Sequence, residues 1–108
     1  MSQDYLGEFE QMVLLSIMRL DDTAYGLAVK DELESVVGRT PSSGGLYTTL
    51  DRMEKKGLVE SYAGEGSQDR GGRPRRYLRL TPEGQLLLAR SRNSLLALWD
   101  GLEGALDR

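Results

Sequence analysis

The sequence predicts a mainly helical fold with one small β-hairpin, in the order helix, helix, helix, strand, strand, helix. Apolar residues recur at helical spacing in the first half of the chain and again near its end. Two short strand-like segments lie between these regions and are separated by a glycine-rich loop. This order is that of a winged helix-turn-helix, which we assign to residues 1–80. A long C-terminal helix over residues 81–108 completes the same compact unit.

The first helix is expected from Leu6 to Leu20, and it is apolar on nearly all sides. Phe9 lies on one face, whereas Leu14 and Met18 point away from that face. A helix of this kind is buried on several sides. In so short a chain, we expect a second copy or a distant helix to cover the other face.

The second helix is expected from Ala24 to Val37, with Gly38 as its C-terminal cap. Ser42 or Ser43 can cap a third helix that runs to about Lys56. The third helix has an apolar inner face and a polar outer face. Leu46, Leu50 and Met53 form the inner face, Gly44, Thr48, Asp51 and Lys55 form the outer face, and Tyr47 and Arg52 flank it.

The segments Leu58 to Ala63 and Arg75 to Leu80 are the expected strands of a long hairpin. Thr81-Pro82-Glu83 then supplies a cap, a first-turn proline and an acidic residue for the last helix. We expect this helix to extend nearly to Leu106. Its apolar residues form one seam, which consists of Leu88, Leu95, Leu98, Trp99, Leu102 and Leu106.

The composition excludes several classes of protein. The chain has 108 residues and neither cysteine nor histidine, so it has no disulfide, thiol nucleophile, imidazole base or ordinary zinc site. Its carboxylates form no catalytic constellation, and we expect no enzyme, metal or cofactor. No signal peptide or membrane span can be recognised, which predicts a cytoplasmic protein.

Positive charge is concentrated in the middle of the chain. The net charge is minus 6 over residues 1–38, plus 4 over residues 39–79 and minus 1 over residues 80–108. The segment "RGGRPRRYLR", Arg70 to Arg79, contains five arginines. An arginine-rich segment is usually a solvated surface. Here it coincides with the hairpin that follows the third helix, and a phosphate backbone is the counter-charge we favour.

The order of elements and this charge predict binding to duplex DNA. A helix with short polar side chains on its outer face fits the major groove, where they meet base edges and phosphates. Arginines in a glycine-rich hairpin suit the flanking backbone or a narrow minor groove.

Four segments together resemble the PadR-like family of bacterial transcriptional regulators. They are "LGEFEQMVLLSIMRL", "YGLAVKDELE" (Tyr25 to Glu34), "GGLYTTLDRMEKKGLVES" (Gly44 to Ser61) and "GGRPRRYLRLTPEG" (Gly71 to Gly84). The short C-terminal part is similar to the family's smaller branch, in which one terminal helix makes the dimer. The resemblance implies a homodimer that represses genes through a palindromic operator and is sometimes released by a small aromatic or drug-like effector.

The resemblance also implies which residues contact DNA. Those on the third helix are Ser42, Ser43, Gly44, Tyr47, Thr48 and Arg52, and those on the hairpin are Arg73, Arg75 and Arg76. Alternatives remain for some of them, since Tyr47 could be core and both serines could be caps alone. Asp51 is left out because it repels phosphate, Lys55 and Lys56 fit backbone or solvent better than bases, and Tyr25 is interpreted as core packing.

The apolar faces of the first and last helices predict a homodimer in which each helix covers the other. The expected interface residues are Phe9, Leu14, Met18, Leu88, Leu95, Leu98, Trp99, Leu102 and Leu106. Trp99, the only tryptophan, is favoured as interface filler, and stacking on a small aromatic or hydrophobic effector is the alternative. A winged-helix protein-interaction module that does not bind DNA is the competing function.

Overall fold

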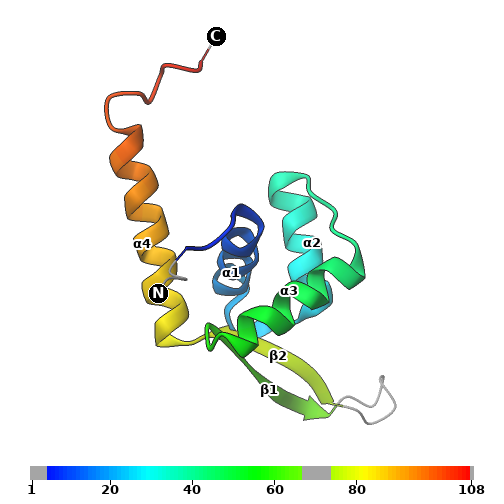
Figure 1. Ribbon diagram of the computed structural model, residues 1–108. Helices are drawn as coiled ribbons and strands as arrows, with labels where there is room; N and C mark the ends of the chain where they lie inside the picture. The colour runs from blue at the N-terminus through cyan, green and yellow to red at the C-terminus, as the bar shows by residue number, and fades with distance from the viewer. Residues whose placement is uncertain (1–4, 67–73, 108) are drawn as a thin grey trace.

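The computed structural model describes residues 5–66 and 74–107. The elements follow the expected order, so the winged helix-turn-helix prediction is confirmed (Figure 1). The helices are α1 (Glu8–Leu20), a 3-10 turn η1 (Asp21–Thr23), α2 (Gly26–Val37), α3 (Ser43–Lys55) and α4 (Pro82–Trp99). The two strands, β1 (Val59–Gly66) and β2 (Pro74–Leu80), pair antiparallel and form the hairpin that we call the wing.

Local interactions explain most of the helix ends. Gly38 follows α2 in the left-handed conformation, with a φ of 70°. The Ser42 hydroxyl caps α3 by accepting a hydrogen bond from the Gly45 N–H at 3.0 Å. Thr81 caps α4 in the same way through the Gly84 N–H, and Pro82 occupies the first helical position. The sequence signals for these ends are therefore confirmed.

The second helix begins two residues later than expected. Ala24 and Tyr25 are extended, and the Ala24 carbonyl accepts a hydrogen bond from the Leu78 N–H of β2 at 2.9 Å. Tyr25 also forms an isolated bridge with Tyr77. This short segment extends the sheet beside β2 and brings the start of α2 next to the wing.

The last helix is shorter than expected, because α4 ends at Trp99 and not near Leu106. Gly101 has a φ of 84°, a left-handed conformation that stops the helix. Leu102 and Leu106 follow in a series of turns. They therefore add apolar surface beyond the end of α4, but they do not lie on the helical seam that the sequence predicts.

The core lies between α1, α2, α3 and the wing, and α4 stands to one side of it (Figure 1). Leu14 has no exposed surface because it lies on the part of α1 that belongs to the core. The expectation that Leu14 contacts a second copy is therefore wrong. The largest fully buried side chains are Leu14, Ile17, Leu46, Leu50, Met53, Leu78, Val13, Val29 and Val59.

Among the described residues, no helix combines the length and apolar character needed to cross a membrane. The same residues contain no group of three or more potential metal ligands.

Candidate nucleic-acid interface

The exposed surface of α3 is formed by side chains opposite its buried face. Leu46, Leu50 and Met53 are buried, so the helix has one fixed orientation on the core. The residues on the other face are all exposed, and they are Gly44, Thr48, Asp51 and Lys55. This places short and polar groups outward, as the helical spacing predicts.

The N-terminal end of α3 is exposed as well. The Ser42 hydroxyl is used in capping, whereas Ser43 is the first residue of the helix and is exposed. A Cβ added at Gly44 would have no heavy atom within 4 Å, so the backbone at this point is open to a partner. A helix N-terminus with accessible backbone suits contact with a phosphate.

Tyr47 is neither a core residue nor a free surface residue. It is 46% exposed, and its ring lies against Gly26 at the start of α2. A Cβ at position 26 would overlap the Tyr47 hydroxyl and would lie 2.8 Å from the ring atom Cε1. The glycine therefore permits the ring to lie against the start of α2.

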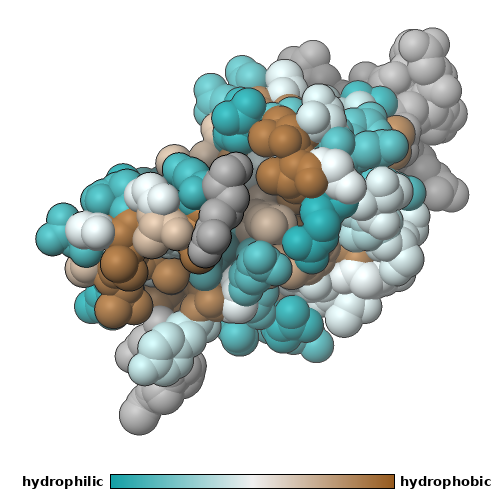
Figure 2. All heavy atoms as spheres, turned by 90° about the horizontal axis from the view of Figure 1, so that it is seen from above, coloured by the Kyte–Doolittle hydropathy of each residue, from teal (hydrophilic) through white to brown (hydrophobic). Residues whose placement is uncertain are grey.

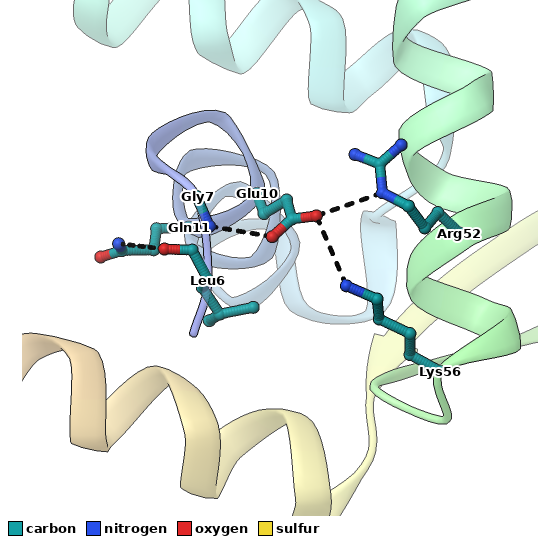
Figure 3. Close-up of polar contacts among 6 residues, drawn as sticks. All are labelled: Leu6, Gly7, Glu10, Gln11, Arg52 and Lys56. Atoms are coloured by element: carbon teal, nitrogen blue, oxygen red, sulfur yellow. Dashed lines mark hydrogen bonds and ion pairs between the residues drawn. The ribbon is translucent and has the colours of Figure 1, made fainter. Parts of the chain in front are cut away.

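Arg52 and Lys56 point toward α1, as Figure 3 shows. The Arg52 Nε lies 3.2 Å from a Glu10 carboxylate oxygen, and the Lys56 Nζ lies 3.8 Å from it. The other Glu10 oxygen accepts a hydrogen bond from the Gly7 N–H at 2.9 Å. The structure thus gives Arg52 a partner within its own subunit, away from the outer face of α3.

The surroundings of Glu10 stabilise its charged form. Burial opposes ionisation, yet the Gly7 N–H and the cations of Arg52 and Lys56 outweigh it and hold the pKa of Glu10 below its usual range. Glu10 was not among the functional residues expected from the sequence. Its position three residues after Gly7, at the start of the helix, was the available signal, since an acid there can cap the backbone.

Arg76 joins the wing to α3 through two carboxylates. It contacts Glu54, and its Nη2 lies 3.7 Å from an Asp51 oxygen. Glu54 also accepts a hydrogen bond from the Ser61 hydroxyl of β1 at 2.8 Å. The Ser61 hydrogen bond and Arg76 lower the pKa of Glu54 despite partial burial, so this connection is charged at neutral pH.

The other described wing arginines differ in their partners. Arg79 pairs with Glu60 at 2.7 Å and lies 4.7 Å above the ring of Tyr62. Arg75 lies 4.1 Å above the ring of Tyr25 and pairs with no carboxylate of the described residues. Arg73 falls outside the described residues. Of the wing arginines that the structure describes, Arg76 and Arg79 are therefore paired within the subunit, which the sequence alone did not indicate.

The residues expected at a dimer interface gather along α4 and its tail. Leu95, Leu98, Trp99, Leu102 and Leu106 are exposed, as is Met18 on α1, whereas Leu88 is buried and Phe9 is partly buried against the core. In Figure 2, hydrophobic side chains gather on the part of the surface formed by α4. A groove of about 630 Å³ separates α1 from α4. It is lined by Gln11, Leu15, Met18, Gln85, Leu88, Ala89, Arg92, Leu95, Leu96 and Trp99.

The fold and this surface define a winged-helix protein of the DNA-binding type. The model of the "Transcriptional regulator PadR-like family" matches residues 14–90. The chain therefore belongs to the PadR-like family of transcriptional regulators, whose members act by binding DNA. Among curated proteins, no match is found.

Solved structures support the same fold. A PadR-like transcriptional regulator from Bacillus cereus is 24% identical, with a TM-score of 0.74, over 93% of this chain and 92% of that one. A PadR family regulator from Eggerthella lenta is 29% identical, with a TM-score of 0.67, over 93% and 87%. A PadR family regulator from Clostridium difficile is 24% identical, with a TM-score of 0.67, over 92% and 95%.

Proposed function

We propose that this regulator is a homodimeric, cytoplasmic repressor that binds a palindromic operator. The observation that carries the proposal is the outer face of α3, where Thr48 and Lys55 are accessible beside the cationic wing. These groups suit a major groove, and the wing suits the flanking backbone. The ion pair between Arg76 and Glu54 is exposed, so it contributes little stability and can exchange for phosphate.

A dimer follows from the apolar surface that one chain leaves uncovered. Leu98 is 73% exposed, and its neighbours on α4 and the facing side of α1 are also accessible. Burying apolar surface contributes about 25 cal/mol per Å², which favours pairing these faces between two copies. Two-fold symmetry would then set two α3 helices about 34 Å apart, the spacing of successive major grooves.

A salt titration tests the DNA-binding function. We expect the protein to bind a labelled duplex of its own upstream region, with an affinity that falls steeply as salt rises, because each phosphate contact adds about 0.9 to the log-log slope. A scrambled duplex is the control for sequence specificity. Absence of binding even at low salt would refute the proposal and favour the protein-interaction module.

We also propose that a small effector binds in the groove between α1 and α4. The groove holds about 630 Å³, is mainly apolar, and has Trp99 in its lining. A planar aromatic ligand could stack there beside the subunit interface. Because Trp99 is the only tryptophan, its emission reports directly on this groove.

The experiment is a titration of tryptophan emission with anilinonaphthalene sulfonate, a planar apolar probe. We expect saturable quenching in the wild type and weaker probe binding after Leu95→Glu. If probe binding is unchanged by Leu95→Glu, the groove is not the ligand site.

A further inference from the structure

We propose that a small pocket at the junction of α2, α3 and the wing binds one backbone phosphate of duplex DNA. The pocket holds about 130 Å³ and is lined by Tyr25, Gly26, Tyr47, Leu50, Arg75, Arg76 and Leu78. We call it the phosphate pocket. This inference rests on the proposed DNA-binding function and gives it a specific contact.

Arg75 supplies the positive charge of the phosphate pocket. The Arg75 Cζ lies 4.1 Å from the centroid of the Tyr25 ring, and this contact holds the guanidinium group in place. The face of the ring offers no oxygen or nitrogen as a hydrogen-bond acceptor. Within residues 5–66 and 74–107, the buried Nε of Arg75 has no hydrogen-bond partner. Buried polar groups normally have one, and a planar guanidinium matches the oxygens of a phosphate.

Tyr47 adds a neutral hydrogen-bond donor to the same pocket. Its hydroxyl reaches the first turn of α2 because Gly26 has no side chain, and a Cβ at that position would collide with the ring. A phenol hydroxyl can donate to a phosphate oxygen without changing the charge of the site. Tyr47 and Arg75 therefore approach one cavity from two elements that are far apart in the sequence.

The acidic groups near the phosphate pocket pair with Arg76 and not with Arg75. Asp51 and Glu54 are the carboxylates beside the pocket, and both lie within ion-pair distance of Arg76. Together the two arginines and the two acids carry no net charge. Arg75 itself makes no ion pair among the described residues, so its guanidinium remains available to an external anion. The anion that fits this place is a DNA phosphate, because the pocket lies where α3 meets the wing, and these are the two elements proposed to contact the duplex.

A phosphate contact would set the register of α3 on the duplex without reading bases. Loss of the contact should therefore weaken binding to all sequences alike. Arg75→Ala should lower the log-log salt slope by about 0.9 per protomer. Arg75→Lys keeps the charge and should restore the slope.

Tyr47→Phe removes only one hydroxyl and should preserve the fold. We expect about tenfold weaker binding to operator and random duplexes alike. Arg79→Ala is the matched control, because it removes an arginine from the same strand that already pairs with Glu60. It should leave the salt slope nearly unchanged. Circular dichroism and light scattering verify that each variant folds and assembles like the wild type.

A methylphosphonate scan of the duplex provides the direct test. Neutralising one phosphate per half-site should weaken binding of the wild type, should have a smaller effect on Tyr47→Phe, and should have no further effect on Arg75→Ala. Equal sensitivity of the wild type and both variants at every phosphate would overturn the inference. If the wild type binds no duplex at all, the proposed function itself fails, which is a different result.

Discussion

At the level of single residues, Gly84 determines how closely α4 approaches the wing. A Cβ at this position would overlap the carbonyl oxygen of Leu58 and would lie 3.1 Å from its carbonyl carbon, and these backbone atoms cannot rotate away. The same carbonyl accepts a hydrogen bond from the Thr81 N–H at 3.0 Å. The start of α4 and the start of the wing are therefore joined by backbone contacts that leave no room for a side chain.

The first prediction concerns this close contact. Gly84→Ala should lower the free energy of unfolding by about 1–3 kcal/mol, because the added methyl group forces α4 away from Leu58. Thermal denaturation measures the change. Gly104→Ala is the control, since a Cβ there would meet no heavy atom within 4 Å. Equal midpoints for the two variants would contradict the prediction.

At the level of elements, charged side chains hold α3 in place from two sides. Glu10 connects α1 to Arg52 and Lys56 at one side (Figure 3), and Glu54 connects to Arg76 of the wing at the other. The apolar face of α3 fixes its depth on the core. These ion pairs add constraints on its rotation, which decides which side chains face outward.

The second prediction is a pH-dependent effect of Glu10→Gln. Glu10 is only 13% exposed and its pKa is lowered on folding, so its charge stabilises the fold above the ordinary glutamate pKa of about 4.3. The variant should lose about 1 kcal/mol of unfolding free energy at pH 7. The difference should disappear as the pH falls through the lowered pKa of the folded state.

Urea denaturation of both proteins at several pH values measures this difference. Glu8→Gln is the control on the same helix, because Glu8 is largely exposed and contacts only Arg39 at 3.5 Å among the described residues. A stability difference for Glu10→Gln that persists in strong acid would contradict the ion-pair explanation.

At the level of the whole molecule, α4 extends beyond the core (Figure 1). Hydrophobic side chains gather on the surface it forms (Figure 2), and a groove lies between it and α1. A group of exposed apolar side chains on adjacent elements is typical of an interface. The family assignment and the proposed operator symmetry are consistent with a second copy at this surface. Because α4 ends at Trp99, Leu102 and Leu106 would contact the partner from the turns that follow the helix.

The third prediction is that one charge on α4 disrupts assembly. Leu98→Glu should convert a dimer into a monomer of 12.0 kDa, because a carboxylate would be buried against the partner's apolar face. Light scattering at micromolar concentration measures the mass. Leu27→Glu, at an exposed position of α2, is the control and should remain dimeric. A wild type that is already monomeric would refute the proposed dimer.

The order of the elements and most of their ends could be predicted from the amino-acid pattern. Gly38, Ser42, Thr81 and Pro82 act on groups only a few residues away, so their effects can be predicted without knowing what lies opposite. The inner and outer faces of α3 followed from helical spacing in the same way. The end of α4 was harder to predict, because an apolar seam continues past the glycine that stops the helix.

What each side chain meets across the fold became clear only from the packed structure. Leu14 is in the core, Arg52 is turned toward Glu10, and Arg75 lies over Tyr25. These contacts join elements separated by many residues, and their geometry depends on how α1, α2 and the wing pack together. Local patterns specify helices and caps, whereas burial and charge pairing depend on the neighbours that the complete fold brings into contact.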